Sequence, residues 1–125
     1  MPTADQFIEG FHLHRGQQFG NYVITNIKCE ERQVQRWNSY EFHIQIFLNW
    51  TPSNSIQQTE HDINNLQHNF DLYVRDEKII RSNSGRPFIC NFNVREIPLS
   101  RIGNKIILNY LGFAQRTSEK VARQY

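Results

Sequence analysis

The sequence is poor in the residues that build helical bundles and disulfide frameworks. Of its 125 residues, only three are alanine, four are lysine and two are cysteine. Alanine and lysine are among the best helix formers, so their scarcity argues against a helical bundle. Cys29 and Cys90 are too few for a disulfide framework, and both stand in segments that alternate apolar and polar residues. We therefore expect buried free thiols and an intracellular location, in the cytoplasm or nucleus.

Long apolar runs and a strong net charge are also missing. No stretch approaches the roughly 20 apolar residues that span a bilayer, so we expect no membrane partner. Residues 1–14 lack the basic start and pure apolar stretch of a signal peptide, and none is expected. The formal net charge is only +2. A charge this small does not drive strong non-specific binding to nucleic acid, although a local basic patch remains compatible with it.

Isoleucine, phenylalanine and side-chain amides are abundant instead, with 14 Ile, 9 Phe, 13 Asn and 11 Gln. Isoleucine and the aromatics favour strands. The clearest pattern lies in residues 40–50, where every second residue is apolar: Tyr40, Phe42, Ile44, Ile46, Leu48 and Trp50. Six apolar residues at a period of two predict a half-buried strand, because a helix would scatter them around its circumference.

Weaker patterns of the same kind predict further strands. Residues 21–29, with extension toward residue 37, form a long hairpin with 40–50 across a turn at 38–39. Shorter strands are predicted at 70–75, 78–81 and 88–94, and residues 106–113 are apolar on both faces, as in a central strand. The polar segment 51–68 is predicted to be a long loop with one helical turn at 62–67. Residues 5–14 and 116–125 are predicted to hold short helices.

Six or seven short strands with regular turns predict a mainly β, single-domain antiparallel β-sandwich. The apolar spacing of Phe92, Val94 and Ile97 before Gly103 and Ile107 resembles the late strands of immunoglobulin-like domains. The resemblance extends to architecture only, because no cysteine stands at position 107. A small barrel like the oligonucleotide-binding fold is the alternative. The predicted organisation is a terminal arm or helix (1–20), the β domain (21–115) and a C-terminal tail or helix (116–125).

Residues that would indicate catalysis or cofactor chemistry are absent or badly placed. The histidines His12, His14, His61 and His68 lie in polar segments without the close spacing of a metal site. Cys90 stands in an apolar strand, where a thiolate is disfavoured, and no serine occupies a nucleophile elbow. We therefore predict no enzyme, no cofactor and no metal.

Two main hypotheses for function remain, beside a third, weaker one of a ligand-binding barrel, which would need an internal pocket. The first is a non-enzymatic protein-interaction module that acts through a sheet face, the long loop or an open edge strand. Its candidate contact residues are Arg36, Trp37, His43, Phe47 and Trp50. Homo-oligomerisation or membership of a larger complex is expected under this hypothesis, because both faces of 106–113 require cover. The second is a small barrel that binds single-stranded nucleic acid through arginines and exposed aromatics, namely Arg32, Arg36, Trp37, Tyr73, Arg75 and Arg81.

Overall fold

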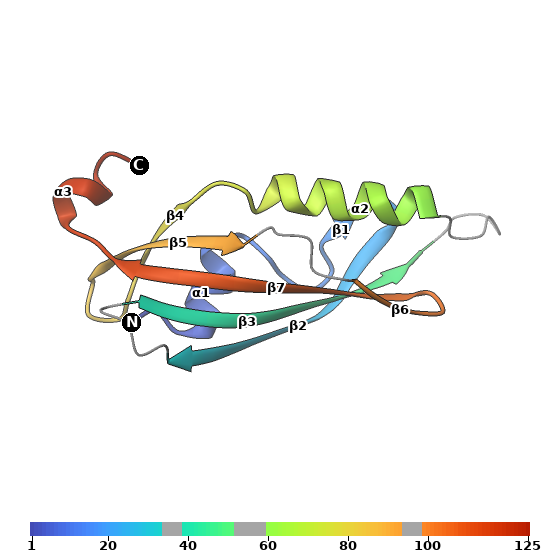
Figure 1. Ribbon diagram of the computed structural model, residues 1–125, viewed down its shortest axis with the longest axis horizontal. Coiled ribbons are helices and arrows are strands. Elements are labelled where there is room, and N and C mark those ends of the chain that lie inside the picture. Colours follow the sequence, from blue (N-terminus) through green and yellow to red (C-terminus); the bar gives the residue numbers. More distant parts are fainter. Residues whose placement is uncertain (34–38, 52–59, 94–98) are drawn as a thin grey trace.

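The computed structural model describes residues 1–33, 39–51, 60–93 and 99–125. Its main feature is one antiparallel sheet of seven strands, curled into a half-barrel (Figure 1). The strands are β1 (Gln18–Phe19), β2 (Tyr22–Gln33), β3 (Ser39–Trp50), β4 (Lys78–Arg81), β5 (Pro87–Asn93), β6 (Ser100–Ile102) and β7 (Lys105–Arg116). Their order across the sheet is β1-β2-β3-β7-β5-β4, and β6 pairs with β7. The predicted mainly β, antiparallel fold is confirmed, and the sandwich-or-barrel architecture takes the form of a single curled sheet.

Three strands of 12 residues, β2, β3 and β7, run along the length of the molecule and form the centre of this sheet (Figure 1). The alternation read in residues 40–50 is confirmed in β3, where Phe42, Ile46 and Leu48 are fully buried and Trp50 is 8% exposed. Strand β7 lies between β3 and β5, as its apolar residues on both faces predicted. The alternation of each strand thus directs one set of side chains into the core and the other set to the opposite face.

Two helices cover the core face of the sheet. Helix α1 (Ala4–Gly10) begins at a capping box between Thr3 and Gln6 and places Phe7 on the ring of Phe42, with ring centroids 4.6 Å apart. Helix α2 (Glu60–Tyr73) stacks Phe70 on Tyr110 of β7 at 5.3 Å. Phe42 and Tyr110 point to the same side of the sheet, so α1 and α2 both lie on one face, and neither of them covers the other face.

The predicted strand at 70–75 is wrong, and the helical turn predicted at 62–67 within the loop 51–68 belongs to a longer helix. Residues 60–73 form one continuous helix, whereas residues 52–59 lie outside the described part of the chain. Ile63, Leu66 and Phe70 follow the helical spacing i, i+3, i+7 and form the buried face of α2. In a strand, Leu72 would share a face with Phe70, but it is 45% exposed while Phe70 is completely buried. The short alternation near Phe70 was therefore the end of a helical pattern.

A short C-terminal helix, α3 (Glu119–Ala122), begins at Ser118, whose hydroxyl accepts a hydrogen bond from the backbone N–H of Val121. The predicted short terminal helices are thereby confirmed. Across the described ranges, no helix is both long and apolar enough to cross a membrane.

Candidate interaction surface

The face of the sheet opposite α1 and α2, here called the outer face, is built from the alternate residues of four adjacent strands. Strand register places these residues side by side in rows across the sheet. The central part of the outer face includes Lys28, Glu30 and Arg32 on β2, Glu41, His43, Gln45 and Phe47 on β3, Ile107, Asn109, Leu111 and Phe113 on β7, and Ile89 and Asn91 on β5. It therefore mixes apolar, amide and charged side chains on one surface.

The apolar part of the outer face follows β7. Phe47 lies beside Ile107 in the register of β3 with β7, and Leu111 and Phe113 continue the row along β7. All four side chains are only partly buried, in contrast to the fully buried Ile106 and Leu108 on the core face of the same strand. An apolar strip that stays partly exposed on a sheet face is typical of a binding surface.

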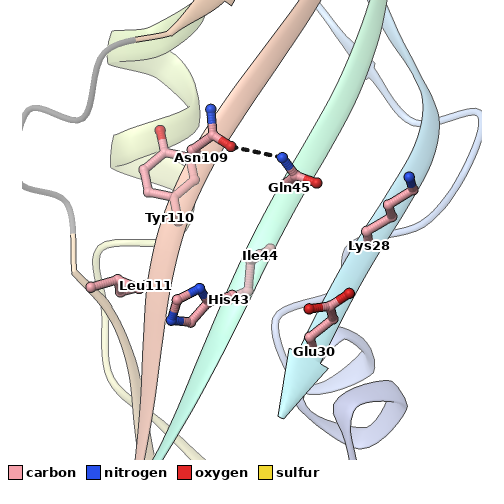
Figure 2. A pocket seen from close by; sticks show the side chains of 8 residues that line it. All are labelled: Lys28, Glu30, His43, Ile44, Gln45, Asn109, Tyr110 and Leu111. Carbon is pink, nitrogen blue, oxygen red and sulfur yellow. Dashed lines mark hydrogen bonds between the residues drawn. The ribbon is translucent and has the colours of Figure 1, made fainter. Parts of the chain in front are cut away.

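A shallow depression of about 490 Å³ lies in the middle of the outer face. Figure 2 shows Lys28 and Glu30 from β2 on one side and Asn109 and Leu111 from β7 on the other, with β3 between them. The side-chain amide of Gln45 donates to the amide oxygen of Asn109 at 3.1 Å across the floor (Figure 2). This cross-strand bond pairs two polar groups that would otherwise interrupt the apolar strip unsatisfied.

Charges on the outer face are mixed and are arranged in close contacts. The Lys28 ammonium lies 5.3 Å from the centre of the Phe47 ring, and one Arg32 nitrogen lies 3.4 Å from His43 Nε2. His43 Nε2 is also 3.9 Å from Glu41 Oε2. Opposite charges thus alternate over the β2 and β3 side of the face, whereas the β7 side is apolar.

The residues predicted for protein binding are distributed over three places. His43 and Phe47 lie together on the outer face, as a sheet-face site requires. Trp50 instead points into the core and packs edge-on against Tyr22 at 5.1 Å. Arg36 and Trp37 lie outside the described residues.

The residues predicted for nucleic-acid binding lie on separate elements. Arg32 is on the outer face of β2, and Arg75 is exposed after the end of α2. Arg81, on the edge strand β4, forms a two-pronged ion pair with Glu119 of α3, with oxygen–nitrogen distances of 2.5 and 2.9 Å. Tyr73 packs edge-on against the Phe19 ring and donates its hydroxyl to a backbone carbonyl.

Sequence reasoning did not select the apolar residues that β7 contributes to the outer face, Ile107, Leu111 and Phe113. The signal that could have identified them was present, because residues 106–113 are apolar at both odd and even positions. What the pattern could not indicate is which of the two faces the helices cover.

The most strongly perturbed titratable groups lie in or beside the core, away from the outer face. Burial raises the pKa of the Cys90 thiol to about 12. Burial, and next a hydrogen bond to Asp71, raise the pKa of the Tyr110 hydroxyl. A protonated, buried thiol is a poor nucleophile, so Cys90 is suited to packing. Among the described residues, no group of three or more histidine, cysteine or carboxylate side chains is placed to hold a metal ion.

Comparison of the chain with protein-family models, with curated proteins and with solved structures gives no match.

Proposed function

We propose that this protein is a non-enzymatic interaction module whose outer face docks against a second copy of the same chain. The observation that supports this most directly is the partly exposed apolar strip of Phe47, Ile107, Leu111 and Phe113, on a face that neither α1 nor α2 covers. Burying these side chains against a second sheet removes apolar surface from water, which is the main driving force of association.

The size of the outer face suits such an interface. A strand of 12 residues extends about 40 Å, and neighbouring strands are about 4.8 Å apart. Three strands of this length with the shorter β5 beside them give a face of about 700 Å². This area is close to the roughly 800 Å² that each partner buries in a stable interface.

The charges of the outer face favour a second copy over a strongly charged partner. Lys28 and Arg32 are balanced by Glu30 and Glu41, so two copies of the face do not repel one another through net charge. In a two-fold arrangement, a residue of one copy meets a different residue of its partner, which allows basic side chains to face acidic ones. Two sheets that pack face to face keep their strands nearly aligned, as in a sandwich.

The mass of the protein in solution tests this proposal. Light scattering or sedimentation velocity is expected to give twice the chain mass of 14.9 kDa at high micromolar concentration. Leu111→Lys places an unpaired charge in the apolar strip and is expected to weaken the dimer at least about thirtyfold, equivalent to ~2 kcal/mol. The matched control is Leu72→Lys, because Leu72 lies exposed on α2, away from the outer face.

A monomer mass of 14.9 kDa at every concentration, for the parent protein and for Leu111→Lys alike, would contradict the proposal. A labelled single-stranded oligonucleotide tests the alternative in the same samples at two salt concentrations. If the protein is monomeric and the oligonucleotide binds with steep salt dependence, nucleic-acid binding replaces self-association as the proposed function.

A further inference from the structure

The outward edge of β2 is unpaired over most of its length in the described structure. Strand β1 pairs only with Tyr22 and Val23, and the preceding loop adds backbone bonds between Ile24 and residues 16 and 17. After the bulge at Thr25, the described residues of β2 pair with β3 on one edge and with no strand on the other edge. Within the described ranges, no backbone hydrogen bond from another element reaches this edge after Ile24. It therefore forms an open strand edge that can pair with another strand.

The direction of the free backbone groups follows from Ile24. Both its N–H and its C=O bond outward, to Gln17 and Gly16, and its side chain faces the core. In a strand, residues whose side chains share a face also direct their backbone groups to the same edge. After the bulge the core-side residues are Ile27 and Cys29, so their N–H and C=O groups point to the open edge.

A groove of about 580 Å³ lies beside this edge, between β2 and α1. Its apolar lining comes from Ile8 of α1, from Leu13 and from Ile27 of β2. Asp5 and Glu9 are exposed residues of α1 on the groove wall. A peptide that extended the sheet here would alternate its side chains between this groove and the outer face.

The groove is electronegative at the end near Cys29. Glu31 accepts a hydrogen bond from the backbone N–H of Ala4 at 3.0 Å, which holds its carboxylate beside the start of α1. Burial, followed by the charges of Glu31, Asp5 and Glu30, raises the pKa of the Cys29 thiol to about 12. The negative charges of these carboxylates therefore add up in the space that an added strand would occupy.

Basic groups at this edge do not cancel those charges. Lys28 and His14 also line the groove, but the three carboxylates of Asp5, Glu9 and Glu30 outnumber the one lysine. The Lys28 ammonium lies over the Phe47 ring on the outer face, and Arg15 donates to the Asn26 side chain. Complementarity of charge then favours a basic partner and disfavours a second copy of β2, whose own Glu30 and Glu31 would meet the same carboxylates.

We infer that the open edge of β2 from Ile27 to Glu31 binds an extended, basic segment of another protein as an added antiparallel or parallel strand. The backbone groups of Ile27 and Cys29 would supply hydrogen bonds that do not depend on sequence. The groove would accept apolar side chains beside Ile8 and lysine or arginine beside Asp5 and Glu9. This is recognition by strand addition, in which the main chain gives affinity and alternate side chains give specificity.

A fluorescein-labelled seven-residue peptide in which pairs of valines alternate with pairs of arginines is a direct probe, read by fluorescence anisotropy, because each face of the added strand then carries both residue types. We expect saturable binding, and protection of the Ile27 and Cys29 amides from hydrogen exchange when the peptide is present. A peptide with glutamate in place of arginine and a peptide N-methylated at alternate residues are both expected to fail. Equal binding of either control peptide, or protection confined to other strands, would overturn the inference.

Protein variants separate the contribution of the acidic side chains of α1 from that of the backbone hydrogen bonds of β2. Asp5→Asn and Glu9→Gln are each expected to weaken binding about two- to fivefold, as for exposed charge pairs, while the matched control Asp76→Asn has no effect. Cys29→Pro removes an outward N–H at a position where an edge strand tolerates proline, and it should abolish binding. If circular dichroism shows that Cys29→Pro does not fold, the N-methylated peptide tests the same hydrogen bonds on the intact protein.

The experiment does not depend on self-association through the outer face. Leu111→Lys is expected to bind the valine–arginine peptide as tightly as the parent protein does. Absence of peptide binding in a protein that forms the expected dimer would overturn the edge-strand inference alone.

Discussion

Gly112 lies where the Phe7 ring of helix α1 packs directly on the sheet, and substituting it tests the packing of the core. It lies on the core face of β7, paired with Phe42 on β3 and Phe92 on β5. A Cβ atom added at Gly112 would stand 2.6 Å from Cζ of Phe7 and 2.9 Å from Cδ1 of Ile44. Glycine weakens a strand interior, so its place here is explained by the Phe7 ring that rests directly on the backbone.

The expected cost of Gly112→Ala follows from two opposing effects. Forcing an extra carbon into a packed core costs about 1–3 kcal/mol, because the Phe7 ring must move away from Phe42. Replacing glycine in a strand recovers roughly 0.5–1 kcal/mol of backbone entropy. We therefore expect the free energy of unfolding to fall by about 1–2 kcal/mol.

A second substitution identifies the cause. Phe7→Leu removes the ring atom nearest to the new Cβ, so the double variant should lose less stability than the sum of the two single variants. Residues in contact show coupling of about 0.5–3 kcal/mol, and we expect about 1 kcal/mol here. Urea unfolding followed by circular dichroism measures all four proteins. A Gly112→Ala protein as stable as the parent, or strictly additive effects, would refute the proposed packing of α1 on the sheet.

Three further predictions concern α2 and the buried polar groups. Tyr110→Phe removes the 2.5 Å hydrogen bond to Asp71 and should cost about 1–3 kcal/mol in urea unfolding. Because folding raises the pKa of Tyr110, the neutral phenol stabilises the fold below about pH 10, and this stabilisation is lost as the pH rises further. The free energy of unfolding of Tyr110→Phe should therefore fall less than that of the parent protein over the same pH range. Cys90 should react with a thiol reagent at neutral pH only at the rate of unfolding, and rapid labelling at Cys90 itself, rather than at the partly buried Cys29, would contradict its burial. Phe70→Ala should destabilise by about 3–5 kcal/mol, whereas Leu72→Ala should change stability by less than ~0.5 kcal/mol; equal effects would contradict the helix.

Much of the sheet was predictable from local pattern. The alternation in residues 40–50 correctly assigned the apolar residues to one buried face, namely Phe42, Ile44, Ile46 and Leu48. This works because neighbouring side chains on a strand point in opposite directions in any fold. The same reasoning predicted a central position for β7. It also placed Trp50 with the apolar face, although Trp50 was at the same time a candidate contact residue.

Local pattern was ambiguous in residues 60–75. Phe70 and Val74 fit both a strand of period two and a helix of period 3.6, and only the exposed Leu72 distinguishes the two. Over so few residues the two periods share positions, and packing on the sheet decides between them. The long polar segment hid the remainder of the helix because its three buried residues, Ile63, Leu66 and Phe70, are widely spaced.

The sequence by itself determined which residues form the long strands and which side chains share a face. Both properties arise from the backbone geometry of consecutive residues. Tertiary structure alone decided that α1 and α2 cover the face of Ile106 and Leu108 and not the face of Ile107 and Leu111. It also decided that β2 keeps an open edge beside acidic residues of α1. These outcomes depend on contacts between segments far apart in the chain, where burial of a whole face, and not the preference of any single residue, sets the free energy.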